Sequence, residues 1–99
     1  MGYRMQENTI EILKAVTEDS LSKYKARIKA IFGSVARGDE SESSDIDILV
    51  DFQEGADLFD FVGLSLFLEE KLHRRVDIVP TDTIKRELRD VILKEAIYI

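Results

Sequence analysis

Apolar residues recur along the chain with two different periods, and this pattern predicts alternating helices and strands. Apolar positions three or four residues apart, typical of amphipathic helices, occur in three segments: 8–21, 56–72 and 81–96. Alternating or β-branched apolar residues, typical of strands, occur in three others: 27–32, 45–52 and 76–79. A short helix, Ser34–Arg37, is expected between Gly33 and Gly38.

Strands that alternate with helices imply a sheet covered by helices. We therefore predict an α/β (α+β) fold with a small mixed β-sheet of about three strands flanked by helices. The 99 residues suit a single domain spanning 1–99. A domain of this size buries one modest core and leaves no room for a deep substrate cavity. A bulky substrate would bind at an open face or be held partly by another protein.

Composition and charge narrow the function classes. The net charge is −6, and the Lys and Arg residues are dispersed, so a nucleic-acid substrate is unlikely, because phosphate neutralisation dominates such binding. The chain has no cysteine, which fits a reducing cytosol. No apolar run approaches the length of a membrane span and no signal peptide is visible. We expect a soluble, cytoplasmic protein with no membrane contact.

Gly33 and Ser34 stand at the expected strand-to-helix turn. Glycine lets a backbone approach a ligand closely, and the start of a helix offers unpaired N–H groups to a phosphate. The Ser34 hydroxyl could add one donor. Taken alone, a Gly-Ser pair is more often an ordinary turn and helix cap.

Three aspartates interrupt apolar strands. Asp45 and Asp47 would share one face of the second strand, where a divalent cation such as magnesium could supply their counter-charge. Asp77 interrupts the third strand and could join them if the two strands are neighbours. Three carboxylates could then hold two magnesium ions about 4 Å apart. Each acid, taken alone, could instead face solvent.

These residues together form a recognisable pattern. Gly33-Ser34, ten intervening residues (35–44) and Asp45-Ile46-Asp47 resemble the signature of the polymerase-β-like nucleotidyltransferase superfamily. With Asp77 in a later apolar strand, the resemblance covers nearly the whole chain. The small size is similar to that of the minimal nucleotidyltransferases, which lack the extra domain of aminoglycoside-modifying and tRNA-tailing relatives.

The resemblance implies a polymerase-β-like fold and a magnesium-dependent transfer of a nucleotidyl group from a substrate such as ATP. In that family the Gly-Ser pair holds the triphosphate, which corresponds to Gly33 and Ser34. The first two acids, Asp45 and Asp47, would bind the metals. Asp77 would bind one metal and help to activate the acceptor hydroxyl.

The resemblance also implies a partner. Minimal nucleotidyltransferases are typically encoded with a HEPN-domain toxin, and as the antitoxin they can adenylylate a tyrosine of that toxin, in a type VII-like system. The acidic net charge agrees with a protein acceptor. An alternative is a non-catalytic nucleotide-binding module that neutralises the HEPN partner by direct binding. Transfer to a small molecule is less favoured, because few residues remain to build its pocket, although a homo-oligomer could supply one.

Two further features leave alternatives open. Arg37 lies three residues after Ser34 on the same helix face, and could contact a nucleotide phosphate or pair with the acidic loop that follows. The apolar run 96–99 either packs on the domain or forms part of a partner surface.

Overall fold

A computed structural model describes residues 2–38 and 45–99, and the side chains from residue 6 onward. Within these ranges the chain forms five α-helices, one short 3-10 helix and one four-stranded sheet. The helices are α1 (Gly2–Ala15), α2 (Thr17–Tyr24), α3 (Gly33–Arg37), α4 (Leu58–Leu72), the 3-10 helix η1 (Thr81–Thr83) and α5 (Arg86–Glu95). The strands are β1 (Ala26–Phe32), β2 (Ile46–Phe52), β3 (Val76–Pro80) and β4 (Ile97–Tyr98).

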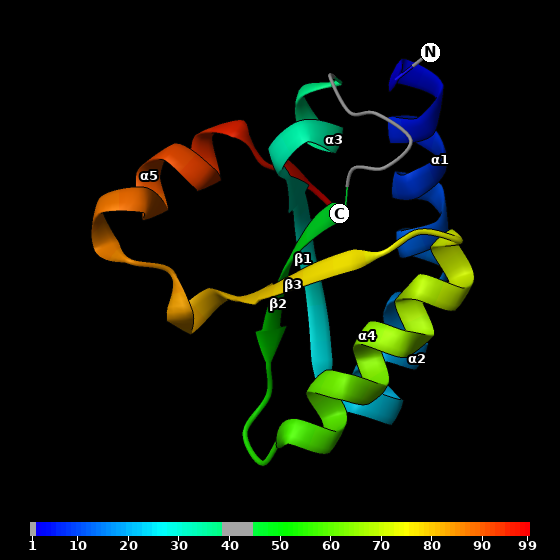
Figure 1. Cartoon of the computed structure of the whole chain (residues 1–99). Coiled ribbons are helices and arrows are strands. Elements are labelled where there is room, and N and C mark those ends of the chain that lie inside the picture. The colour runs from blue at the N-terminus through cyan, green and yellow to red at the C-terminus, as the bar shows by residue number, and fades with distance from the viewer. Residues whose placement is uncertain (1, 39–44) are drawn as a thin grey trace.

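The sheet is mixed, as the sequence predicts. Its strand order is β3-β2-β1-β4, in which β2 and β3 run parallel and both neighbours of β1 run antiparallel to it. Helices α1, α2 and α4 cover one face of the sheet, and α5 lies over the other (Figure 1). The helix α4 connects the parallel pair β2 and β3, because a parallel connection must cross from one end of the sheet to the other.

The strand β2 shows how the sequence assigns the two faces. Ile46, Ile48 and Val50 belong to the main core cluster, packed with Leu64 and Leu68 of α4. Successive side chains of a strand point to opposite faces. Asp47 and Leu49 therefore point to the face that α5 only partly covers.

Two side-chain hydrogen bonds fix the residue at which α4 begins. The Asp60 N–H donates to Asp57 Oδ1 at 3.1 Å, and the Asp57 N–H donates to Asp60 Oδ2 at 3.0 Å. This reciprocal capping box satisfies two backbone donors that the first turn would otherwise leave unpaired.

Several predicted helix boundaries are wrong. The first helix, expected from residue 8, begins at Gly2. The first apolar stretch is also not one helix: α1 ends at Ala15 and α2 begins at Thr17, because the backbone of Val16 (φ −105°, ψ 9°) departs from helical values. The last helix begins at Arg86, since the first residues after Pro80 form the 3-10 turn η1 instead.

The expectation of about three strands is also one short. Ile97 and Tyr98 form β4, paired antiparallel with Ile31 and Ala30 of β1. The Ile99 N–H donates to the Lys29 carbonyl at 2.9 Å, so the apolar end packs on the domain. A two-residue strand is too short to produce a detectable period, and only its tertiary partner reveals it.

Among the described residues, no helix combines the length and apolar character needed to cross a membrane.

Candidate active site

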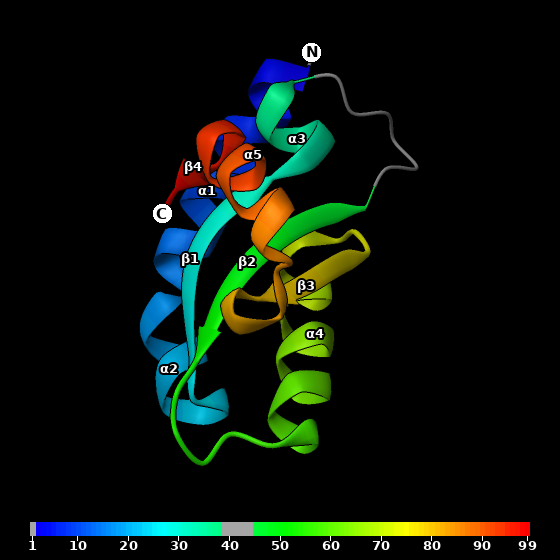
Figure 2. The same cartoon turned by 90° about the vertical axis from the view of Figure 1, so that its left-hand side faces the viewer.

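Parallel pairing of β2 with β3 brings two of the predicted acids together. Asp47 lies directly opposite Asp77 in the register, and each strand continues into apolar residues beyond it. The Ile46 N–H donates to the Arg75 carbonyl at 2.9 Å, which fixes this register at the start of both strands. Figure 2 shows β1, β2 and β3 side by side. Paired residues share a face of the sheet, so both carboxylates lie on the face opposite the core side chains of β2.

Asp45 lies immediately before β2 and is exposed. It is two residues from Asp47, which places it on the same side of the chain where the strand begins. Its negative charge is close enough to raise the pKa of Asp47. The backbone therefore places Asp45 near Asp47 at the start of β2.

Gly33 borders the same corner from β1. Phe32 pairs with Asp47 across the β1–β2 ladder, and Gly33 follows with a positive φ of +71°. A Cβ atom at this position would collide with Asp47 Oδ2 and would lie 3.0 Å from Asp47 Cγ. Only glycine allows the turn to approach the carboxylate so closely, so the start of α3 borders Asp47.

The short helix α3 that follows this turn is held from α1. Gln6 Nε2 donates to the Ala36 carbonyl at 2.8 Å and to the Val35 carbonyl at 3.3 Å. The Val35 carbonyl also accepts from the Gly38 N–H at 3.1 Å, so Gln6 adds a second donor there and supplies one to the Ala36 carbonyl. A helix of five residues is too short to be stable alone, so this support keeps Ser34 in place.

The electrostatic environment of Asp47 is unfavourable for a charged carboxylate. Its pKa is raised from 3.8 to about 6, first by burial and then by the negative charges of Asp77 and Asp45, in that order. The positive charge of Arg37 acts in the opposite direction and lowers this pKa. A carboxylate in such a place is stabilised by added positive charge.

Arg37 lies at the end of α3 and reaches α5. Its Nη1 atom is 3.4 Å from Glu95 Oε2, and both side chains are about half exposed. No pattern in the sequence points to Glu95, which is 58 residues away. The acidic loop offered as the other partner of Arg37, residues 39–44, lies outside the described residues.

The donor set suits a hard divalent cation, which prefers carboxylate oxygens. In the ranges 2–38 and 45–99, however, no three acidic, histidine or cysteine side chains are already grouped closely enough to hold an ion. The register brings Asp47 and Asp77 together, whereas Asp45 lies outside the strand. Carboxylates that share a site repel one another, so a cation would draw them closer than they lie here.

Comparisons with known proteins agree with this geometry. Residues 10–99 match the nucleotidyltransferase domain family. The protein adenylyltransferase MntA of Thermococcus cleftensis is 37% identical over 99 residues, which cover the whole of both chains. A candidate protein adenylyltransferase of Methanocaldococcus jannaschii is 47% identical over 77 residues, covering 78% of this chain and 83% of the relative.

Solved structures show the same arrangement. A candidate minimal nucleotidyltransferase has a TM-score of 0.73 at 44% identity, covering 90% of this chain and 94% of that one. A protein described as a toxin–antitoxin with AMP-PNP has a TM-score of 0.67, covering 93% of this chain and 70% of that one. Its identity is 24%, so this likeness shows a shared fold.

Proposed function

This chain belongs to the nucleotidyltransferase domain family, and we propose that it transfers AMP from ATP to a hydroxyl group of a partner protein. One observation carries the proposal. Asp47 and Asp77 lie opposite each other on parallel strands, and Asp47 is also in van der Waals reach of the Gly33 turn. A metal-bound triphosphate needs both kinds of group, carboxylates and close-approaching backbone, in one place.

Gly33 and Ser34 hold the triphosphate in this proposal. The missing side chain of Gly33 lets the turn approach Asp47 closely, and Ser34 offers a backbone N–H and a hydroxyl. Arg37 contributes positive charge on the same short helix, and it already acts on the charge of Asp47. Together these groups would fix the position of the leaving pyrophosphate.

Asp45, Asp47 and Asp77 would hold magnesium. The bound ions would neutralise negative charge on the phosphates and on the developing oxyanion. The raised pKa of Asp47 supports this assignment, because burial and neighbouring acids make its charged form costly without a cation.

The reaction is an in-line substitution at the α-phosphorus of ATP. The acceptor hydroxyl loses its proton to the Asp77 carboxylate, and its oxygen forms a bond to the α-phosphorus. The bond from that phosphorus to the bridging oxygen breaks, and pyrophosphate leaves. Positioning and charge neutralisation supply most of the rate enhancement for such transfers.

We propose a tyrosine of a HEPN-domain toxin as the acceptor. Relatives that align over most of this chain are named protein adenylyltransferases. The open face that carries the acids can accommodate a macromolecule, and the net charge of −6 suits a protein acceptor better than a polynucleotide. Adenylylation of the toxin would make this chain an antitoxin.

The test is label transfer from α-³²P-ATP, in magnesium, to the HEPN protein encoded beside this chain. We expect labelled toxin with the natural sequence and none with the double variant Asp47→Asn/Asp77→Asn. Asp19→Asn, an exposed acid of α2, is the matched control and should label normally. A folded natural protein that transfers no label to its bound partner would contradict the proposal.

The alternative is neutralisation by contact. It is favoured by an apolar stripe along α4 that remains exposed, comprising Leu58, Phe59, Val62 and Leu66, of which Phe59 is 87% exposed. In this case the Asp47→Asn/Asp77→Asn variant would still protect cells from the toxin. Loss of protection with complex formation retained would favour catalysis.

A further inference from the structure

A small cavity lies between α5 and the open face of the sheet. Its volume is about 220 Å³, and its floor is Leu49 of β2, which is 1% exposed. Ile84 and Leu93 form apolar walls. Cavities that hold whole drug-sized ligands usually exceed about 300 Å³, so this one has room for a single ring system.

The cavity is next to the acids and on the side away from the phosphate turn. Leu49 lies two residues after Asp47 on the same face of β2. Two residues of a strand span about 6.8 Å, so the two Cα atoms are separated by about that distance along β2. Gly33 contacts Asp47 from the opposite direction, where β1 ends. A nucleotide with its phosphates at Gly33 and its α-phosphate at Asp47 can extend its sugar and base along β2 toward Leu49.

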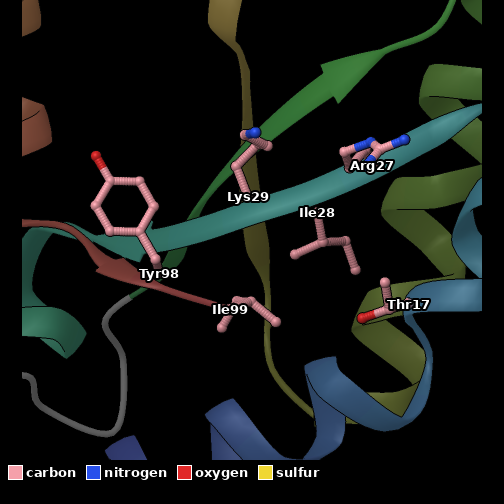
Figure 3. A pocket seen from close by; sticks show the side chains of 6 residues that line it. All are labelled: Thr17, Arg27, Ile28, Lys29, Tyr98 and Ile99. Carbon is pink, nitrogen blue, oxygen red and sulfur yellow. The ribbon is translucent and has the colours of Figure 1, made fainter.

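The rim of the cavity offers an aromatic face and hydrogen-bond donors. Tyr98 is 57% exposed. Figure 3 draws a second pocket, which shares Lys29 and Tyr98 with this cavity, and shows the Tyr98 ring on the same side of β1 as Lys29, with Ile28 and Ile99 on the other side. Lys29 and Arg89 also line the cavity, and their side chains can only donate hydrogen bonds. A planar aromatic ligand with acceptor nitrogens would satisfy all three.

We infer that this cavity binds the purine base of the nucleotide, an inference that rests on the proposed function. A purine stacks on an aromatic ring and presents ring nitrogens as acceptors. The aromatic ring of an acceptor tyrosine fits less well. Its hydroxyl is the reacting group and must lie at the phosphate, so the donors of Lys29 and Arg89 would face no acceptor.

Calorimetric titration of the protein with ATP and, separately, with inorganic tripolyphosphate, both in magnesium, tests the inference. Leu93→Trp fills the cavity, and Tyr98→Ala removes the stacking surface without disturbing the buried floor. Both variants should bind ATP about tenfold more weakly, since base stacking contributes about 1–3 kcal/mol. Their affinity for tripolyphosphate should change less than about twofold, because the phosphate site is untouched.

Leu88→Trp is the matched control, since Leu88 is on the same helix but 52% exposed and outside the cavity. It should bind both ligands as the natural protein does. Thermal unfolding of each variant establishes that it is folded, and Tyr98→Ala decides the test if Leu93→Trp unfolds.

Three results would overturn the inference. Equal affinities of the natural protein for ATP and tripolyphosphate would show that the base makes no contact. Unchanged ATP affinity in the folded variants, with or without loss of acceptor labelling, would assign the cavity to something other than the base. In both cases the proposed function stands. If the natural protein binds neither ligand, the inference and the proposed function fail together.

Discussion

Asp47 and Asp77 are 30 positions apart in the chain and lie directly opposite each other in the parallel ladder of β2 and β3. The ladder fixes their backbones, so neither acid can move away without breaking strand pairing. Without added positive charge, the repulsion between the two ionised carboxylates destabilises the folded state. This relationship makes the pair the first target for substitution.

Asp77→Asn should lower the rate of nucleotidyl transfer by at least about 100-fold, because it removes both a carboxylate ligand and the proton acceptor. The amide keeps the size of the side chain, so stability should be unchanged or slightly higher. Single-turnover rates with saturating ATP and magnesium measure the effect. The control is Asp90→Asn, at an exposed acid of α5, which should leave the rate within about twofold of the natural protein. Equal rates for the two variants would show that Asp77 takes no part in the reaction.

Gly33→Ala should abolish transfer and destabilise the fold by about 2 kcal/mol or more. Its φ of +71° costs a non-glycine residue about 1 kcal/mol, and the new Cβ would collide with Asp47 Oδ2. Chemical denaturation and label transfer would measure the two effects. A natural level of transfer by this variant would show that close approach at Gly33 is not required.

Gly38→Ala is the matched control for that substitution. Gly38 has a similar φ of +77°, but no heavy atom of the described residues lies within 4 Å of the added Cβ. It should lose only the backbone contribution, about 1 kcal/mol, and keep its activity.

The site was largely predictable from sequence because it rests on short-range patterns. Alternation along β2 placed Asp45 and Asp47 on one face, and a glycine before a helix indicated a close-approach turn. The pairing of Asp47 with Asp77 was only conditional, since sequence does not show which strands are neighbours. The structure supplies that step through the parallel register.

Other features depend on contacts that no local pattern contains. The break at Val16, the pairing of β4 with β1 and the contact of Arg37 with Glu95 all depend on tertiary packing. The cavity under α5 depends on Leu49, which sequence marked only as one apolar residue in a strand. Helix and strand periods identify the elements, but they do not determine the space between a helix and the sheet.

The pKa of Asp47 predicts a dependence of stability on pH in the absence of metal. Burial and the charges of Asp77 and Asp45 raise this pKa to about 6 from 3.8. A carboxyl with a raised folded-state pKa favours folding below pH 3.8, and that contribution is lost as the pH rises through about 6.

Asp47→Asn, which cannot ionise, should therefore be more stable than the natural protein at pH 8 in EDTA. We expect a gain of about 1 kcal/mol, allowing for solvent screening of a partly exposed group. At pH 4 the difference should shrink, since Asp47 is then protonated in the folded state. Urea denaturation at both pH values measures the difference in the free energy of unfolding between the two proteins. An equal difference at pH 4 and pH 8 would show that ionisation of Asp47 does not affect stability.

Arg37 is placed to act on the acids, and its removal should weaken nucleotide binding more than it weakens the fold. Its pair with Glu95 is half exposed at 3.4 Å, so losing it should cost less than about 1 kcal/mol of stability. Arg37 offers positive charge to the phosphates, so Arg37→Ala should reduce the affinity for ATP several-fold. Because Arg37 lowers the pKa of Asp47, the same variant should also raise that pKa further. Glu95→Gln breaks the same ion pair but keeps the positive charge, so it should bind ATP as the natural protein does. Equal losses of ATP affinity in both variants would instead assign Arg37 a purely structural role between α3 and α5.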